Sequence, residues 1–256
     1  MSNIITFTTD FGLQDYFVGV MKGVILSINP GVQLVDLNNN VKRHDLMNGA
    51  ISVMNSYKYF PDGTVHLVVV DPGVGSKRKP VGVFADSHYF IGPDNGVFSL
   101  LYNEFTDFRV YEITNESCML DIISSTFHGR DIFAPAAAFL SSGNDITLLG
   151  EEIHDPVRIG YEQPVFNNNR IIGKVVYVDT FGNLITNIKS DTVGDNDHIL
   201  ISGIEFERVG ESYSEAEIGQ PLVVRGSSGY LEIAVNLDSA SEYFGVSEMK
   251  VEVIKN

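Results

Sequence analysis

The sequence predicts an α/β domain followed by a smaller domain made only of β-strands. Up to about residue 165, apolar runs of strand length alternate with segments whose apolar residues recur at helical spacing. From about residue 170 onward, short strand-like runs are separated by turn residues, with no convincing long helix. We therefore expect an N-terminal α/β domain over 1–165 with a mostly parallel sheet. An all-β domain, a barrel or a sandwich, is expected over 170–256.

The elements of the N-terminal domain follow one another in a strand–helix pattern. Asp15 is expected to cap the first helix, and Asn29-Pro30 to end it. Parallel sheets bind ligands outside the carboxyl ends of their strands, and Asp10 and Asp71 both stand at such ends. The expected strands are 4–10, 32–37, 64–71 and 81–86, and the expected helices are 15–30, 45–63 and 134–143.

The elements of the C-terminal domain are short and closely spaced. Turn signals separate them, which is typical of an all-β fold. The expected strands are 171–179, 184–188, 198–203, 221–226, 229–235 and 250–254.

Composition and charge exclude several classes of protein. The formal net charge of −16 repels phosphate backbones, so a nucleic-acid partner is not expected, and solubility is the simplest role of the charge. No stretch approaches the roughly 18 apolar residues of a membrane helix, and the N-terminus lacks the features of a signal peptide. Cys118 is the single cysteine, so we expect no internal disulfide and a cytoplasmic location.

Two stretches of the N-terminal domain combine acidic and basic residues with glycines. In "TTDFGLQD" (8–15), the Asp10 carboxylate could accept hydrogen bonds from the two hydroxyls of a ribose, or it could simply cap a turn or a helix. In "VVVDPGVGSKRKP" (68–80), the two glycines permit a tight loop that could bring Arg78 back onto Asp71. This stretch matches neither a P-loop nor a dinucleotide fingerprint, and the alternative is a solvated surface loop.

A third stretch, "STFHGRDIFAP" (125–135), places His128 just before a helix. A histidine can orient or deprotonate water near neutral pH, although a single histidine is more often structural. The nearby "PDNG" (93–96) is expected to be only a tight turn.

Two stretches of the C-terminal domain suit a charged ligand. In "VDTFGNLITNI" (178–188), Asp179, Phe181 and Asn183 would suit an ammonium group and a heteroaromatic ring, or they could simply form a hairpin turn. In "SSGYLEIAVN" (227–236), a Ser-Ser-Gly turn could donate hydrogen bonds to a carboxylate, or it could be only a turn. The sequence has no zinc-type Cys/His spacing, no G-x-S-x-G and no His-Glu-x-x-His, but an acidic metal site through Asp10, Asp15 and Asp71 stays open.

Taken together, these segments resemble the adenosine-forming S-adenosyl-L-methionine (SAM) hydrolases, also called SAM hydroxide adenosyltransferases, which are related to the fluorinases and chlorinases. The resemblance covers almost the whole chain, with the segments in the family's order. It implies an α/β domain followed by a small β-barrel, and a homotrimer with active sites between neighbouring subunits. It also implies that SAM is the substrate, with no cofactor and no metal.

The resemblance also implies roles for individual residues. Asp71, Arg78 and His128 match a triad that orients and activates water. Asp10 matches the carboxylate that binds the ribose diol, and Asp179 the carboxylate that binds the methionine ammonium group. Phe181, Asn183 and Tyr213 match residues around the adenine, and Ser227 and Ser228 match the site for the methionine carboxylate.

Three positions differ from the halogenating relatives. The fluorinase has a tyrosine where this chain has Asp71, a halide-binding serine where it has Gly129, and an arginine near the adenine where it has Val235. The expected reaction is therefore hydrolysis of SAM to adenosine and L-methionine, by in-line attack of water or hydroxide on the ribose C5′. The alternatives are a metal-dependent phosphohydrolase that uses Asp10 and Asp71, and a SAM-binding module without turnover.

Overall fold

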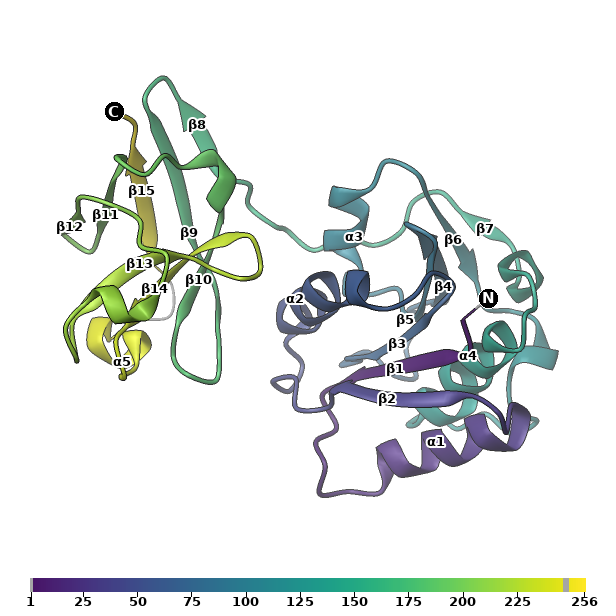
Figure 1. The fold of residues 1–256 in the computed structure, drawn as a ribbon. Coiled ribbons are helices and arrows are strands. Elements are labelled where there is room, and N and C mark those ends of the chain that lie inside the picture. The colour runs from purple at the N-terminus through teal and green to yellow at the C-terminus, as the bar shows by residue number, and fades with distance from the viewer. Residues whose placement is uncertain (1, 246–248) are drawn as a thin grey trace. The chain divides into compact units, whose positions relative to one another are not determined.

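The computed structural model describes residues 2–245 and 249–256, which form two compact units (Figure 1). The N-terminal unit is Met1–Tyr161 and the C-terminal unit is Glu162–Asn256. Each unit has its own sheet and its own apolar core. Within the described part of the chain, no helix has the length and apolar character needed to cross a membrane.

The N-terminal unit is built on a seven-stranded sheet with the strand order β2-β1-β3-β5-β4-β6-β7. The strands β2, β1, β3 and β5 pair in parallel, while β5–β4, β4–β6 and β6–β7 pair antiparallel. The strands are β1 (Ile4–Thr9), β2 (Gln33–Asn38), β3 (Val65–Val69), β4 (Pro80–Ala85), β5 (His88–Pro93), β6 (Phe108–Glu112) and β7 (Glu152–Ile153).

The change from parallel to antiparallel pairing has a local cause. Asp86 and Ser87 have φ angles of 47° and 64°, which suit a two-residue hairpin between β4 and β5. Such a turn returns the chain antiparallel, whereas a parallel neighbour needs a helical crossover. The expected α/β class is confirmed, and its parallel part is the half of the sheet that contains β1 and β3.

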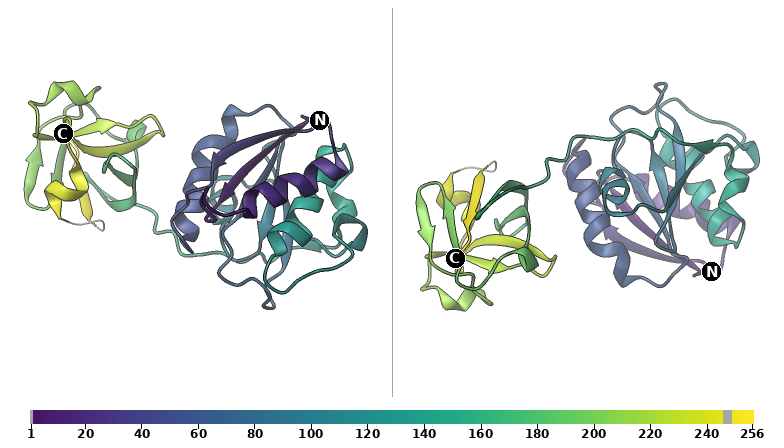
Figure 2. Two further views of the ribbon diagram at one scale, coloured as in Figure 1. Left: turned by 90° about the horizontal axis from the view of Figure 1, so that it is seen from below. Right: turned by 90° about the horizontal axis from the view of Figure 1, so that it is seen from above.

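Helices cover both faces of this sheet (Figure 2). Along β3, Leu67 and Val69 pack in the core beneath α1 and α4, while Val68 packs in the core beneath α2 and α3. This alternation follows from the two-residue period of a strand. The helices are α1 (Phe17–Ile28), α2 (Leu46–Ser56), α3 (Ser99–Glu104) and α4 (Ala134–Ser141), with a π-helical turn at Gly129–Phe133 before α4.

The caps of the first two long helices differ. Asp45 caps α2, because its carboxylate accepts a hydrogen bond from the Asn48 backbone N–H. The expected Asp15 cap of α1 is wrong: Tyr16 occupies the cap position, and its side chain makes no capping hydrogen bond.

The C-terminal unit is a curled antiparallel sheet with the order β12-β11-β15-β9-β10-β14-β13, and β8 pairs with β9. The sheet surrounds a core that includes Ile188, Ile233 and Val253, which confirms the expected barrel-like fold. The six expected strands are present, and one short helix, α5 (Ala240–Phe244), is added. The strands are β8 (Val165–Asn167), β9 (Arg170–Val178), β10 (Leu184–Lys189), β11 (His198–Ile201), β12 (Ile204–Phe206), β13 (Pro221–Arg225), β14 (Tyr230–Val235) and β15 (Lys250–Ile254).

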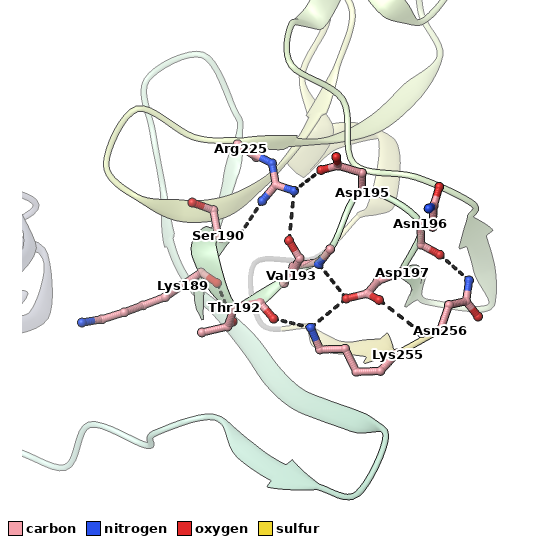
Figure 3. A network of polar contacts seen from close by, with 11 residues as sticks. Lys189, Ser190, Thr192, Val193, Asp195, Asn196, Asp197, Arg225, Lys255 and Asn256 are labelled. Carbon is pink, nitrogen blue, oxygen red and sulfur yellow. Dashed lines mark hydrogen bonds and ion pairs between the residues drawn. The ribbon is translucent and has the colours of Figure 1, made fainter.

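Two cations hold the irregular 190–197 segment against the barrel (Figure 3). The Arg225 guanidinium donates to the carbonyl oxygens of Ser190 and Val193 and pairs with Asp195. Lys255 pairs with the buried Asp197 carboxylate at 2.8 Å. The segment forms no strand ladder, so these side chains supply hydrogen bonds and ion pairs that tie it to β13 and β15.

Candidate active site

The first group of site residues lies at one edge of the N-terminal sheet. β1 and β3 are parallel neighbours in which Thr9 pairs with Val69, so Asp10 and Asp71 follow the strands at the same edge. The Asp10 carboxylate accepts a hydrogen bond of 2.9 Å from the His44 backbone N–H. This is the edge at which α/β sheets bind ligands.

The loop after β3 brings Arg78 back onto Asp71. Arg78 Nε lies 3.1 and 3.0 Å from the two carboxylate oxygens of Asp71, and Nη2 lies 2.6 Å from Oδ2. The side chains are only 8% and 5% exposed, so this ion pair is shielded from water. Gly75 makes the close approach possible: its φ is 75°, and a Cβ there would lie 2.2 Å from the Ser125 carbonyl oxygen.

His128 completes a chain of contacts with this pair. Its Nδ1 lies 2.7 Å from Arg78 Nη2. A guanidinium can only donate, so Nδ1 accepts and the imidazole carries its proton on Nε2. Burial and the Arg78 charge lower the pKa of His128 below its usual value. The imidazole is therefore neutral near pH 7, and its basic nitrogen is already occupied by Arg78.

One nitrogen of the Arg78 guanidinium, Nη1, has no hydrogen-bond partner among the described residues. Arg78 Nη1 is one of two buried side-chain polar atoms in the described part of the chain that have no hydrogen-bond partner. The guanidinium also lies over the Phe133 ring, at 5.1 Å from its centre. A buried donor without a partner costs about 1–3 kcal/mol, so this N–H is poised to bind an oxygen ligand.

A second carboxylate supports the loop that carries His128. Asp131 is fully buried and accepts hydrogen bonds from the Ser124 N–H at 2.8 Å and the Ser124 hydroxyl at 2.7 Å. Arg130 donates to the same carboxylate. Burial raises the pKa of Asp131, but these hydrogen bonds outweigh it and hold the pKa below its usual value. The roles of Ser124 and Asp131 were not predicted, although Asp131 belongs to the noted His-Gly-Arg-Asp cluster.

The second group of site residues lines a pocket of about 620 Å³ on the C-terminal unit. Five of the six residues predicted in this unit line it: Asp179, Phe181, Asn183, Tyr213 and Ser227. Ser228 is not among its lining residues.

The Asp179 carboxylate organises the turn between β9 and β10. Its Oδ1 accepts hydrogen bonds of 2.9 Å from the N–H groups of Phe181 and Asn183. Its Oδ2 accepts from the Asn183 side-chain amide at 3.0 Å. The turn leaves the Phe181 ring 78% exposed, as a flat surface on which another ring can stack. The hairpin turn considered from the sequence is therefore present, and its residues line the pocket.

Glu232 is a pocket residue that sequence reasoning missed. It is 7% exposed, lines the pocket and accepts a hydrogen bond of 2.6 Å from the Tyr213 hydroxyl. Burial raises the pKa of Glu232. The signal in the sequence is a single carboxylate inside the apolar run 230–235. The strand is buried on both faces, and a buried charged residue usually has a specific partner.

Within the described part of the chain, the acidic residues do not gather into a metal site. Across residues 2–245 and 249–256, no group of three or more His, Cys, Asp or Glu side chains is arranged to hold a metal ion.

The two groups of site residues differ in the ligands that they suit. The sheet edge offers a buried N–H donor suited to an oxygen nucleophile, and the barrel pocket offers carboxylates and aromatic rings suited to a cationic ligand.

Comparison with known proteins agrees with this geometry. Residues 5–150 match the SAM hydroxide adenosyltransferase N-terminal domain, and residues 173–251 match the C-terminal domain of the same family. The chain is 35% identical to an (R)-S-adenosyl-L-methionine hydrolase of Methanocaldococcus jannaschii, over 98% of this chain and 96% of that protein. It is 36% identical to the protein of the same name from Thermus thermophilus, over 94% and 95% of the two chains.

More distant relatives and solved structures extend the comparison. A fluorinase of Actinoplanes is 27% identical over 91% of both chains. An uncharacterized conserved protein from Thermotoga maritima has a crystal structure with a TM-score of 0.91 and 36% identity, covering 98% of this chain and all of that one. Since the matched domains span most of the sequence in the expected order, the chain belongs to the SAM hydroxide adenosyltransferase family.

Proposed function

We propose that this protein hydrolyses SAM to adenosine and L-methionine. The observation that carries the proposal is the buried Arg78 guanidinium, which Asp71 and His128 hold with Nη1 unpartnered. Such a group stabilises negative charge on an attacking oxygen. The relatives named (R)-S-adenosyl-L-methionine hydrolase support the substrate.

The proposed reaction is an in-line displacement at the ribose C5′. A water or hydroxide oxygen forms the new C5′–O bond while the C5′–S bond breaks. The electron pair of the broken C5′–S bond returns to sulfur. Methionine leaves as a neutral thioether, so the leaving group needs no acid, and the proton of the water passes to solvent. Arg78 Nη1 binds the attacking oxygen, while His128 keeps the guanidinium in place through Nδ1. Alignment of this kind can contribute about 7–11 kcal/mol.

The remaining residues of the two groups would bind the substrate. We propose that the Asp10 carboxylate binds the ribose diol and that Asp179 binds the ammonium group of methionine. Phe181, Asn183 and Tyr213 would surround the adenine, and Ser227 with Ser228 would bind the methionine carboxylate. The acidic pocket favours this ligand, because the sulfonium and the ammonium are both cations.

Two structural facts favour water over halide as the nucleophile. Gly129 is crowded: a Cβ there would lie 3.2 Å from Met21 Sδ and 3.3 Å from Phe127, so a halide-binding serine has little room. Asp71 is committed to Arg78 by an ion pair, a role that a tyrosine could not fill. Val235, where the halogenases have an arginine, is an almost buried pocket residue.

The test is incubation with SAM in ¹⁸O-labelled water, with products identified by mass spectrometry. We expect methionine and adenosine, with the label on the 5′ oxygen. Formation of S-adenosylhomocysteine would instead mean methyl transfer, and binding without any product over hours would mean a SAM-binding module. A chelator is expected to leave the rate unchanged, whereas loss of activity would support the metal-dependent alternative.

Assembly, location and cofactor use belong to the same proposal. We propose a homotrimer with active sites at subunit interfaces, supported by the resemblance to the family, and analytical ultracentrifugation measures its mass. We also propose that the protein works in the cytoplasm, supported by its single, buried, free cysteine. Turnover by the purified protein with SAM alone tests the proposal that no cofactor is needed.

A further inference from the structure

The turn at Pro93–Gly96, expected from the sequence to be no more than a tight turn, contacts both ends of the loop that carries Asp71 and Arg78. We propose that Asn95 is a positioning residue for this ion pair. The inference rests on the proposed hydrolase function for its kinetic consequence, but its structural basis lies entirely within the N-terminal unit.

The first contact is at the start of the loop. Asn95 Nδ2 donates a hydrogen bond of 2.9 Å to the carbonyl oxygen of Val70. Val70 is fully buried, lies one residue beyond the end of β3 and immediately precedes Asp71. The Asn95 amide therefore fixes the peptide from which the Asp71 side chain extends.

The second contact is at the end of the same loop. The Asp94 backbone N–H donates a hydrogen bond of 2.8 Å to the carbonyl oxygen of Lys79, which immediately follows Arg78. Two neighbouring residues of one turn thus bind the carbonyl just before Asp71 and the carbonyl just after Arg78. The loop 71–78 is closed at its base by this turn.

The turn itself is fixed on its other side. Asn95 Oδ1 accepts from the Val97 N–H at 3.2 Å, so both ends of the amide are used and its orientation is defined. The buried Asp94 carboxylate accepts from the Val157 N–H at 2.9 Å. At Gly96 a Cβ would lie 2.4 Å from the Ile159 side chain. The turn therefore cannot shift to follow a displaced loop.

Loss of the Asn95 donor has a defined consequence. The buried Val70 carbonyl would lose its side-chain partner, and the start of the loop would be free to move relative to Lys79. The Arg78 N–H that binds the nucleophile depends on this geometry, and a misplacement of about 1 Å can cost roughly 100-fold in rate. The loop 71–78 contains none of the residues proposed to bind SAM, so we expect kcat to fall while KM stays the same.

The test is Asn95→Asp, which keeps the shape and the Oδ1 acceptor but replaces the donor by a carboxylate oxygen. Asn115→Asp is the matched control, because Asn115 Nδ2 donates to the Leu148 carbonyl at 2.8 Å and Oδ1 accepts from the Ser117 N–H at 3.0 Å. N95D is expected to lower kcat about 10- to 100-fold with unchanged KM for SAM. N115D is expected to keep the wild-type kcat.

A second comparison separates positioning from general destabilisation. In an Arg78→Ala background, the further substitution Asn95→Asp should lower kcat less than twofold, because the group that Asn95 positions is gone. Wild-type kcat in N95D, a loss no larger than in N115D, or a full additional loss in the R78A background would each overturn the proposal. Should N95D not fold, Asn95→Ala removes the side-chain donor without adding charge and takes its place.

A measurement without substrate keeps this inference distinct from the proposed function. The Arg78 Nε–H, held by Asp71, is expected to give a slowly exchanging NMR signal in the wild type and in N115D. In N95D this signal should exchange faster or disappear, and an unchanged signal would refute the inference. If the wild-type protein does not turn over SAM, the proposed function fails alone and this measurement still decides the role of Asn95.

Discussion

At the scale of single residues, the main question is what His128 does. The accepting nitrogen of its imidazole is already occupied: Nδ1 takes a hydrogen bond from Arg78, and a guanidinium can only donate. His128 is therefore placed to orient the guanidinium, and a role as the base that removes the proton of the water would require this contact to break. The two roles make different predictions.

The first prediction is a comparison of His128→Asn with His128→Ala. The Asn side-chain oxygen can accept from Arg78 much as Nδ1 does, so we expect H128N to keep within about 10-fold of the wild-type kcat. H128A leaves Arg78 without this partner and should lose about 100-fold, the loss that a misplacement of about 1 Å can cause. Equal losses in both variants, measured with saturating SAM, would identify His128 as the base.

The pH profile provides a further check on the same residue. Protonated His128 cannot accept from Arg78, and burial with the Arg78 charge lowers its pKa below the usual value. The wild-type kcat should therefore be constant near neutral pH and fall only below about pH 6.5, the unperturbed value. H128N should lack this acidic limb, and its persistence would assign the limb to another group.

At the scale of elements, two polar clusters hold strands and loops together. The 190–197 segment depends on Arg225 and Lys255, as Figure 3 shows. Within the N-terminal sheet, His66 on β3 is hydrogen-bonded at 2.8 Å to Thr6 on β1 and at 3.2 Å to His88 on β5. Each cluster joins residues that lie far apart in the sequence. The contribution of each to stability can be measured.

For the barrel, we expect Arg225→Met to lower the free energy of unfolding by about 1–3 kcal/mol. The substitution leaves the carbonyls of Ser190 and Val193 without their guanidinium donor. Arg208→Met is the matched control: its side chain is 69% exposed and its ion pair with Glu215 should contribute under about 1 kcal/mol. Urea unfolding of both variants gives the comparison, and equal losses would show that the network in Figure 3 adds nothing.

For the sheet, we expect stability to fall as the pH is lowered. Burial lowers the pKa of His66 to about 3, against about 6.5 in the unfolded chain. Above pH 6.5 the imidazole is neutral in both states and has no effect. Below it, the unfolded chain binds a proton that the folded chain does not, so His66 lowers the free energy of unfolding by up to about 1.4 kcal/mol per pH unit.

Urea unfolding between pH 7 and 4.5 measures this dependence. The pH slope should be smaller in His66→Gln, which cannot titrate. Burial also lowers the pKa of His88, which therefore adds a slope of the same sign that H66Q retains. An identical slope in the wild type and H66Q would mean that His66 does not contribute.

At the scale of the whole molecule, the two units carry complementary chemistry. The N-terminal unit holds the Asp71–Arg78–His128 cluster and Asp10, and the C-terminal unit holds the acidic, aromatic pocket around Asp179. The proposed function draws on residues of both units.

We therefore expect Asp10→Ala and Asp179→Ala to reduce kcat/KM as strongly as removing His128, by about 10²-fold or more. Each carboxylate is proposed to fix one end of SAM, and positioning of the reacting atoms is the larger share of the rate enhancement. D179A also removes the acceptor of two turn N–H groups, so its fold must be checked by circular dichroism. If D10A kept wild-type turnover and affinity for SAM, substrate positioning by Asp10 would not matter as much as we expect.

Local patterns in the sequence determined the class of each domain and most of its elements. Six of the eight strands described in the C-terminal sheet, and the helices over 17–28, 46–56 and 134–141, follow from alternation and helical spacing, which depend only on neighbouring residues. The expected pocket residues Asp179, Phe181 and Asn183 also lie together, because one short turn carries all three. Strand 88–93 was missed, since its pairing depends on the turn at Asp86-Ser87 rather than on its own apolar pattern.

Only the tertiary structure decided which distant residues meet. Glu232 reaches Tyr213 across 19 positions, and Asn95 reaches the Val70 carbonyl across 25, so no local period could reveal either contact. The unpartnered N–H of Arg78 is likewise visible only when every neighbour is in place. The sequence by itself therefore determined which chemical groups the protein has and on which elements they stand. The packing of strands and loops decided which of those groups are buried, paired or left free to act, because burial and hydrogen bonding are properties of the whole folded unit.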